Sequence, residues 1–428
     1  MASVRPIRAT LYGLAAEGAP RGVLDSLLSP PYDVIDTAQR DALVAQNARN
    51  SVLLDLPERL PDDAADAPYR RAAARWSTWR SDGTLRDDPA ECLYLYEEQP
   101  TDGRAIRGIF AGIPVGAYGS ETGILRHEST LDGPKAERRA LIAAVKANLS
   151  PVIVLRSGGH DAFLRAADAV AKTPPLAAGR TPSGSDYRIW RVSPEASDGV
   201  ALLEWARGAD LVIADGHHRY ETARDFAERG GGLALALGLI VEADRHSPAL
   251  YATHRIVSAH DPDALSARLS ASPLVVHHAT TTRDQLASRF ADGAPEPAEL
   301  EIGLVTARGA SLVTIDRSAI GRALSGRSVA YQSLSVAALA VLLDRALGID
   351  AAAAASGAIR YVRGADRAIA SALADPVPSA ALLLHGERPD QVVAVAEAGE
   401  TMPQKSTLFA PKPPTGLLFL AHEINRVD

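Results

Sequence analysis

Apolar and polar positions alternate along the chain in short blocks, which predict helices and strands in turn. Apolar residues three and four positions apart predict helices over Asp36–Asn47, Tyr69–Arg80, Pro134–Asn148, Ser333–Leu347, Ala365–Leu373 and Arg388–Ala398. Short apolar runs predict strands over Arg5–Tyr12, Leu93–Glu97, Ile106–Val115, Pro151–Leu155, Leu211–Ala214 and Ala380–Leu384. This alternation indicates a mixed α/β or α+β fold. We expect three regions along the chain, residues 1–120, 121–258 and 259–428.

One buried strand is expected to run directly into a polar turn. Asp215 ends the apolar run, and Gly216 permits a sharp bend. The first helical turn then holds His217, His218 and Arg219. The start of such a helix can bind phosphate, because its free backbone N–H groups donate hydrogen bonds and the helix dipole places a partial positive charge there. The alternative is that Asp215 only caps the helix and that the histidines are surface residues.

A second polar segment leads into the helix expected from Pro134. Lys135 and Arg138 are three positions apart and therefore share one helix face. His127 and Glu128 precede them and offer an acid/base or metal-binding pair. The alternative is a solvated, charged first turn with an ordinary cap.

A third segment, residues 402–414, contains two of the five lysines and four prolines. Lys405 stands beside the hydroxyls of Ser406 and Thr407. A true P-loop is excluded, because position 404 is glutamine and Pro403 interrupts the backbone nest. A lysine that reaches a phosphate still fits this segment. The alternative is a proline-rich stretch that packs on the core.

A fourth segment is the rigid turn formed by Pro30 and Pro31, which fix the backbone before Tyr32 and Asp33. A carboxylate held on such a turn can face a ligand. The alternative is a purely structural turn.

Composition and charge narrow the class of protein. Hydrophobic residues make up 46% and charged residues 23%, as in ordinary globular proteins. The 45 basic and 52 acidic residues give a net charge of −7, which argues against broad nucleic-acid binding. Apolar runs stay well below the ~18 residues of a membrane helix, and the first residues contain no apolar signal core. Because Cys92 is the only cysteine, an intramolecular disulfide and a cysteine-based zinc site are excluded. We expect a cytoplasmic enzyme or binding protein.

Taken together, the four segments resemble the bacterial domain-of-unknown-function family number 1015. The similarity rests on Pro-Pro-Tyr-Asp-Val-Ile, on His-Glu-x-Thr followed by Gly-Pro-Lys and Ala-Asn-Leu-Ser-Pro, on Ala-Asp-Gly-His-His-Arg-Tyr-Glu-Thr-Ala, and on Met-Pro-x-Lys-Ser-Thr-x-Phe-x-Pro-Lys-Pro-Pro-Thr-Gly. It runs from near the N-terminus to about Phe419 and therefore covers nearly the whole chain.

The Asp-Gly-His-His-Arg run is also similar to the ParB/sulfiredoxin-like signature. This resemblance implies a ParB/sulfiredoxin-like core with additional N-terminal and C-terminal α/β elements. Sulfiredoxins need a cysteine where His217 stands, and ParB proteins add a basic helix-turn-helix region that the sequence lacks. Free L-serine kinases carry Asp-Gly-His-Thr-Arg, which differs from residues 215–219 only at His218. The resemblance therefore implies small-molecule phosphoryl transfer.

We assign the candidate site residues on this basis. The expected catalytic residues are Asp215, Glu128 and His217, with Glu128 also the expected Mg²⁺ ligand. The expected phosphate-binding residues are Gly216, His218, Arg219, Lys135, Arg138, Lys405, Ser406 and Thr407. The expected substrate-binding residues are Tyr32, Asp33, His127, Thr130, Tyr220 and Glu221.

The expected function is transfer of a phosphoryl group from ATP, ADP or pyrophosphate, with Mg²⁺, to a hydroxyl, with free L-serine implied by the resemblance alone. The alternative is a ParB-like regulatory protein that binds a nucleotide or phosphate without turnover. A third option is a phosphatase or phosphotransferase acting on another hydroxylated metabolite. We expect no nucleic-acid or membrane partner, and the sequence leaves the oligomeric state open, with a homodimer as one option. All of these expectations require the four distant segments to converge.

Overall fold

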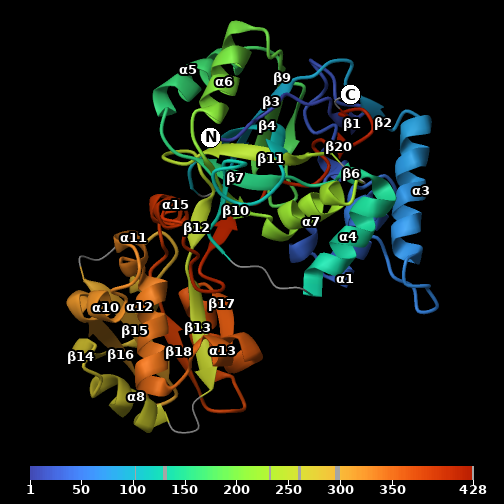
Figure 1. Cartoon of the computed structure of the whole chain (residues 1–428). Coiled ribbons are helices and arrows are strands. Elements are labelled where there is room, and N and C mark those ends of the chain that lie inside the picture. The colour runs from blue at the N-terminus through green and yellow to red at the C-terminus, as the bar shows by residue number, and fades with distance from the viewer. Residues whose placement is uncertain (102, 129–132, 231–232, 259–261, 295–298, 427–428) are drawn as a thin grey trace. The chain divides into compact units, whose positions relative to one another are not determined.

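The computed structural model describes residues 1–101, 103–128, 133–230, 233–258, 262–294 and 299–426 (Figure 1). The chain forms two compact units. Unit 1 consists of Met1–Arg126, Thr130–Ala249 and Pro411–Asp428, and unit 2 consists of His127–Ser129 and Leu250–Ala410. Unit 1 thus joins three separate stretches of the chain, whereas unit 2 is one continuous stretch with a short addition. The three consecutive regions expected from the sequence stay a prediction.

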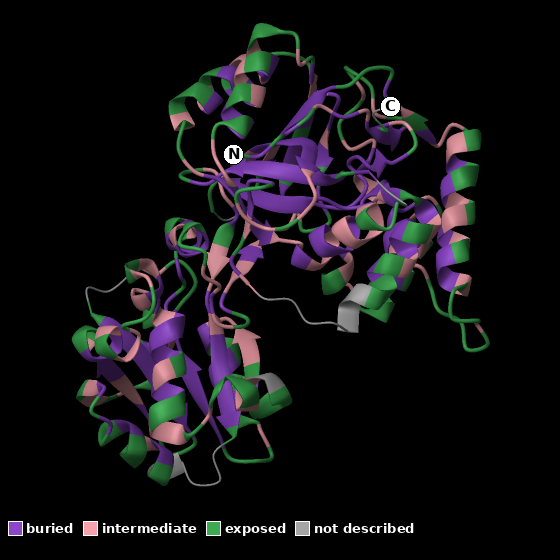
Figure 2. Ribbon diagram, in the orientation of Figure 1, coloured by how far each residue is buried: buried purple, intermediate pink, exposed green. Residues whose placement is uncertain are grey.

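Unit 1 is built on an eight-stranded mixed sheet in the order β5-β10-β7-β11-β4-β3-β9-β8 (Figure 1). Its strands are β3 Leu93–Gln99, β4 Ile106–Pro114, β5 Ile124–Arg126, β7 Val152–Arg156, β8 Ala177–Arg180, β9 Asp186–Val192, β10 Leu211–Asp215 and β11 Leu235–Glu242. The parallel pairs are β10 with β5 and β11 with β7, and the other neighbours are antiparallel. Almost every residue of the central strands is buried, as Figure 2 shows.

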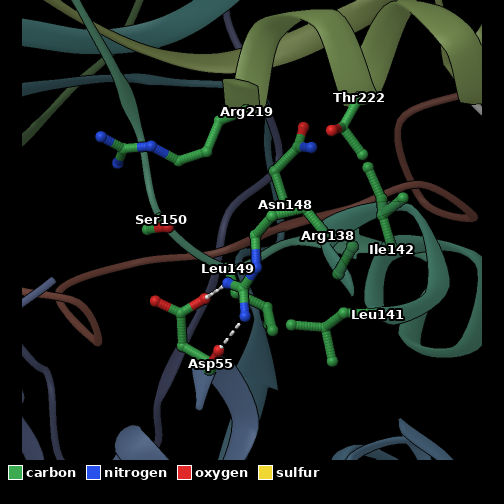
Figure 3. A pocket seen from close by; sticks show the side chains of 10 residues that line it. Asp55, Arg138, Leu141, Ile142, Asn148, Leu149, Ser150, Arg219 and Thr222 are labelled. Atoms are coloured by element: carbon green, nitrogen blue, oxygen red, sulfur yellow. Dashed lines mark hydrogen bonds and ion pairs between the residues drawn. The ribbon is translucent and has the colours of Figure 1, made fainter. Parts of the chain in front are cut away.

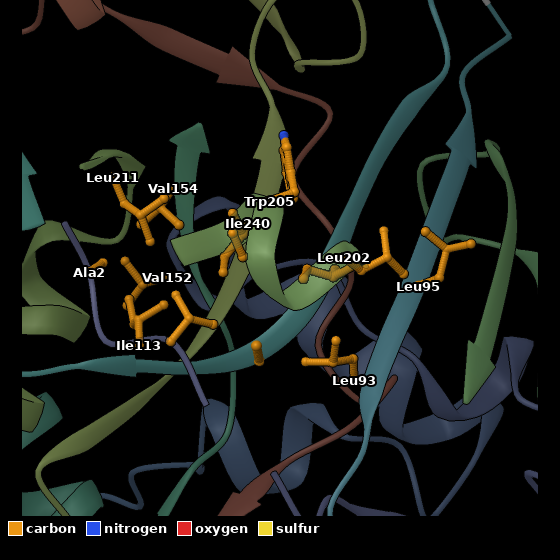
Figure 4. Packing of buried hydrophobic residues seen from close by; sticks show 14 of the residues in the cluster. Ala2, Leu93, Leu95, Ile113, Val152, Val154, Leu202, Trp205, Leu211 and Ile240 are labelled. Atoms are coloured by element: carbon orange, nitrogen blue, oxygen red, sulfur yellow. The ribbon is translucent and has the colours of Figure 1, made fainter. Parts of the chain in front are cut away.

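Helices cover this sheet with apolar side chains. The helices of unit 1 are α1 Thr37–Gln46, α2 Val52–Asp55, α3 Ala67–Ser81, α4 Gly133–Val145, α5 His160–Val170, α6 Ser197–Arg207 and α7 His217–Glu228. Leu202 and Trp205 of α6 pack in one cluster with Val154 and Ile240 of the sheet (Figure 4). The cluster also includes residues of α4, α5 and α7, so the sheet anchors the helix that follows β10.

Short elements complete unit 1. They are the 3-10 turns η1 Asp25–Leu27 and η2 Tyr32–Val34, the pair β1 Thr10–Tyr12 with β2 Leu85–Asp87, and the pair β6 Ala147–Asn148 with β20 Leu420–Ala421. The strand expected over Arg5–Tyr12 is regular only in β1, while Arg5 and Ile7 form isolated bridges. Pro6 lies between these two bridges and cannot donate a backbone hydrogen bond.

Unit 2 contains a six-stranded antiparallel sheet in the order β14-β16-β15-β18-β13-β17. The strands wholly in unit 2 are β13 Thr253–Ser258, β14 Val275–Thr281, β15 Leu300–Thr306, β16 Gly309–Ile315, β17 Ile359–Arg363, β18 Ser379–Leu383 and β19 Leu408–Ala410. Strand β12 Ala249–Tyr251 begins at the last residue of the second stretch of unit 1 and continues into unit 2. Its helices are α8 Pro262–Ser270, α9 Arg283–Arg289, α10 Arg317–Ala323, α11 Val329–Gln332, α12 Ser335–Leu342, α13 Ala351–Ala353, α14 Ala365–Leu373 and α15 Pro389–Glu397, with π-helical turns η3 Leu343–Leu347 and η4 Ala354–Ala358.

The mixed α+β class expected from the sequence is confirmed. Helix α14 has the predicted bounds, and the helix predicted over Ser333–Leu347 is present as α12 followed by a π-helical turn. Within the described part of the chain, the helices are too short or too polar to cross a bilayer.

Candidate functional site

The turn between β10 and α7 has the geometry that its sequence predicts. Asp215 is the last residue of β10, and α7 begins at His217. Gly216 between them has φ +94°, in the left-handed region that glycine adopts without strain. A Cβ atom at this position would lie 2.8 Å from Nε of Arg219. Glycine therefore allows both the bend and the close approach of Arg219.

Two cations hold the carboxylate of Asp215. Arg219, one turn along α7, forms an ion pair with it and also donates to the Pro151 carbonyl. Nζ of Lys412 lies 2.7 Å from Oδ1 of Asp215 and also forms an ion pair with Asp33. Three of the four polar segments therefore meet at one point of unit 1. They are the Pro-Pro-Tyr-Asp turn, the Asp-Gly-His-His-Arg run and the end of segment 402–414, which supplies Lys412.

Both cations keep their charge although only about a tenth of each side chain is exposed. Burial alone would lower the pKa of Arg219, but Asp215 and neighbouring acidic groups outweigh it and raise that pKa. Burial likewise opposes the charge of Lys412, and the carboxylates of Asp215 and Asp33 raise its pKa. The helix start therefore carries permanent positive charge, although carboxylates balance it.

A second buried ion pair lies nearby. Nη1 of Arg138 donates to Oδ1 of Asp55 over 2.8 Å, and Nη2 donates to the backbone carbonyl of Asp55 over 2.6 Å. The guanidinium also lies over the ring of Tyr32, with Cζ 3.9 Å from the ring centroid. Thr415 donates to the other carboxylate oxygen of Asp55 over 3.2 Å. This pair holds Arg138 in a single orientation. We call Asp33, Asp55, Arg138, Asp215, Arg219 and Lys412 the Asp215 cluster.

A pocket opens beside three members of this cluster, Asp55, Arg138 and Arg219 (Figure 3). Its empty space, including the open mouth, is about 360 Å³. The polar residues that line it are Asp55, Arg138, Asn148, Ser150, Arg219 and Thr222. The buried hydroxyl of Thr222 has no hydrogen-bond partner among the described residues. The pocket therefore offers two guanidinium groups and a hydroxyl to a small polar ligand.

The remaining residues of the Asp-Gly-His-His-Arg-Tyr-Glu run face different surroundings. His217 is buried and His218 is half-buried in the first turn of α7. The ring of Tyr220 is fully buried and stacks on Tyr118 at 5.3 Å between centroids. Glu221 accepts a hydrogen bond of 3.2 Å from the Tyr118 hydroxyl. Tyr220 and Glu221 thus contribute to packing, and their expected role in substrate binding stays a prediction.

The His-Glu and Lys-Ser-Thr motifs come together in unit 2. Nε2 of His127 is hydrogen-bonded to Oγ1 of Thr407 at 2.7 Å, and the His127 carbonyl accepts from Met402 N over 2.7 Å. The backbone N–H of Lys405 donates to Oε1 of Glu128 over 3.1 Å. Two motifs that lie far apart in sequence therefore form one local structure. We call His127, Glu128, Lys405, Ser406 and Thr407 the His127 cluster.

The structure thus places the predicted residues in two groups. Unit 1 brings together Tyr32, Asp33, Arg138, Asp215, Gly216 and Arg219, and unit 2 brings together the His127 cluster. Thr130 lies outside the described residues, as does the side chain of Lys135, although α4 includes that residue.

Sequence reasoning missed Asp55, Lys412 and Thr222 as members of the site. Lys412 carries a usable signal, because it is one of only five lysines and stands between two prolines. Thr222 lies within the Asp-Gly-His-His-Arg-Tyr-Glu-Thr run but was not assigned a role. Asp55 belongs to an ordinary helical segment, and the pattern around it offers no comparable sign.

Comparisons with known proteins agree with the predicted family. Residues 4–339 match the family described as "Protein of unknown function (DUF1015)", and the chain belongs to this family. The chain has no match among curated proteins. Similar solved structures include SbnI with a C-terminal truncation from Staphylococcus aureus, at 12% identity and TM-score 0.36, covering 72% of this chain and 85% of that one. A free serine kinase in complex with AMP matches at 11% identity and TM-score 0.35, covering 73% and 91%.

Proposed function

We propose that unit 1 binds phosphate groups and transfers a phosphoryl group from ATP, ADP or pyrophosphate to the hydroxyl of a small molecule. The observation that carries this proposal is the meeting of Arg138, Arg219 and Lys412 around the start of α7 and its pocket. Phosphoryl transfer requires positioning and charge neutralisation more than covalent chemistry by the protein. Buried cations at a helix N-terminus supply both.

In this proposal the carboxylates of the Asp215 cluster hold the cations in position. Asp33, Asp55 and Asp215 balance the three cations and hold them in place before a ligand binds. An incoming phosphate is expected to take over part of these cation contacts. The backbone N–H groups at the start of α7 add further donors. The site is therefore prepared for an anion without carrying a large uncompensated charge.

Asp215 is the proposed acceptor of the hydroxyl proton. In the transfer step, the acceptor oxygen bonds to phosphorus, the bond from phosphorus to the bridging donor oxygen breaks, and the hydroxyl proton passes to the Asp215 carboxylate. Mg²⁺, when bound, would neutralise phosphate charge. Carboxylates suit this ion, and within unit 1 Asp33 offers that donor chemistry. Glu128 belongs to unit 2, and its expected role as the Mg²⁺ ligand stays a prediction.

Free L-serine is the first acceptor to test. This choice rests on the similarity of residues 215–219 to the Asp-Gly-His-Thr-Arg run of free L-serine kinases. The direct experiment incubates the protein with L-serine, Mg²⁺ and each of the three donors, and detects phosphoserine. Donor binding without any product would support the second candidate, a regulatory protein that binds a nucleotide or phosphate without turnover.

Two variants test the residue roles. Asp215→Asn is expected to lower turnover by about 10²- to 10⁴-fold while donor affinity stays within a few-fold, because the amide cannot accept the proton. Lys412→Met is expected to weaken both donor binding and turnover. Lys172→Met is the matched control, because Lys172 is exposed elsewhere in unit 1. Near-normal turnover of Asp215→Asn would remove Asp215 as the base.

A further inference from the structure

Three side chains converge at the C-terminal ends of two neighbouring strands in unit 1. Strands β7 and β11 are parallel, and Glu242 at the end of β11 is paired in register with Arg156 at the end of β7. The chain continues from β7 through two glycines to His160, the first residue of α5. From β11 it continues through a short turn to His246. The ends of parallel strands are a common place for ligand sites.

The three side chains face one another. Oε2 of Glu242 lies 3.2 Å from Nδ1 of His160 and 3.1 Å from Nδ1 of His246. The two imidazole rings are stacked, with centroids 5.8 Å apart and an angle of 15° between their planes. One nitrogen or oxygen atom from each of the three residues lies within 4.8 Å of the other two.

His160 supplies a second, independent observation. Its side chain is only 10% exposed. Neither ring nitrogen forms a hydrogen bond with the described residues, although Nδ1 lies close to the Glu242 carboxylate. Buried polar atoms normally have a partner, so an imidazole in this position points to a ligand.

We propose that His160, Glu242 and His246 bind one divalent transition-metal ion, with Zn²⁺ as the best fit. Two imidazole nitrogens and one carboxylate oxygen are the donor set that suits zinc and its first-row neighbours, whereas Mg²⁺ prefers oxygen ligands alone. Metal–ligand bonds of about 2.0–2.1 Å in a tetrahedral arrangement place the ligand atoms roughly 3.3 Å apart. The two distances to Glu242 are close to this separation.

The backbone around the site holds the carboxylate in place. Oε1 of Glu242 accepts from the N–H of Asp244 over 2.9 Å, and Oε2 accepts from the N–H of Arg245 over 3.0 Å. The nearby guanidinium of Arg156 donates to the carbonyls of Ser157 and Trp205. Glu242 is thus oriented by backbone donors, which is the kind of support that metal ligands need.

The site is tested by metal binding to the full chain in the absence of substrate. After removal of metals with a chelator, Zn²⁺ titration by calorimetry is expected to show one ion per chain. His160→Ala and His246→Ala are each expected to weaken binding by at least about 100-fold. His277→Ala is the matched control, since His277 is an exposed histidine of unit 2 and its removal should leave binding unchanged. Mg²⁺ should not compete at equal concentration.

Two results would overturn the proposal. The first is wild-type protein that binds neither Zn²⁺ nor Co²⁺, and the second is unchanged stoichiometry and affinity in both histidine variants. Should a variant fail to fold by circular dichroism, anomalous scattering at the zinc edge from wild-type crystals decides the matter. An ion bound away from Glu242 would then contradict the proposal. Because no substrate is used, these outcomes are independent of phosphoryl transfer.

Discussion

Arg138 and Arg139 are adjacent in α4, yet their side chains have very different surroundings. Arg138 forms its ion pair with Asp55 in the protein interior, with both residues buried. Arg139 pairs with Asp225 at the surface, where its own side chain is 44% exposed. Arg138 is therefore a buried charge, and Arg139 is a surface charge.

This contrast gives a stability prediction. Arg138→Leu is expected to lower the free energy of unfolding by about 3–5 kcal/mol, because it leaves the Asp55 carboxylate buried without its cation. Arg139→Leu is expected to cost no more than about 1 kcal/mol. All four tryptophans belong to unit 1, so urea unfolding followed by tryptophan fluorescence measures this difference. Equal effects of the two variants would contradict the assignment of a buried pair.

His254 is a fully buried histidine whose Nδ1 accepts the Leu384 N–H over 3.2 Å. Burial lowers its pKa to about 4, and the charges of Arg255 and His385 act in the same direction. The unfolded chain, with a pKa of about 6.5, binds the proton first. The stability that neutral His254 contributes is therefore complete above about pH 6.5 and is lost as the pH falls toward 4.

His254→Asn tests this pH dependence. The asparagine oxygen can accept the Leu384 N–H but does not titrate. Between pH 7 and pH 4, the variant is expected to lose about 3 kcal/mol less unfolding free energy than the wild type. Urea unfolding followed by circular dichroism at both pH values provides the measurement, with His277→Asn as an exposed control. Identical pH profiles for wild type and His254→Asn would refute the prediction.

At the scale of elements, helix α7 has a glycine with positive φ at each end. Gly216 precedes the helix at φ +94°, and Gly230 follows it at φ +73°. A Cβ atom at Gly216 would meet the Arg219 side chain, whereas a Cβ atom at Gly230 has nothing within 4 Å. The two positions therefore share backbone strain, while only Gly216 also affects the ion pair with Asp215.

Alanine substitutions separate these two effects. Gly216→Ala and Gly230→Ala are each expected to cost about 1–2 kcal/mol of stability through the left-handed backbone. Only Gly216→Ala is expected to weaken pyrophosphate binding, by about tenfold or more, because it displaces Arg219. Calorimetric titration with pyrophosphate gives the comparison. Equal pyrophosphate affinity in the two variants would show that Arg219 does not hold the ligand.

Caps and apolar spacing predicted elements correctly where the structure depends only on residues that are close in the sequence. The helix predicted over Asp36–Asn47 is present as α1, and Asp36 caps it in a reciprocal capping box with Gln39. The expected strand over Arg5–Tyr12 is regular only over β1, because pairing depends on what lies beside it. A strand needs partners from elsewhere in the chain, whereas a helix satisfies its own hydrogen bonds.

At the scale of the whole molecule, nearly all of unit 2 is one continuous segment, residues 250–410. Its core cluster includes Ile256, Phe290, Val305 and Leu383, which all belong to that segment. We expect residues 250–410 to fold alone, with a cooperative urea transition and dispersed NMR amide signals. Residues 402–407 should be less protected from hydrogen exchange, because His127 is absent. A fragment without a cooperative transition would contradict two independently stable units.

The sequence by itself determined the family, the mixed α+β class, several of the helices and the motifs that supply the Asp215 and His127 clusters, because glycine turns, caps and apolar periodicity act over a few residues. Tertiary structure decided the rest. It brought Asp55 and Lys412 to their partners and placed His160 beside Glu242 and His246, and it gave each unit segments from distant parts of the chain. Such pairings depend on which strand ends and loops the packed core brings together. Local sequence patterns do not indicate which residues far apart in the chain will become neighbours.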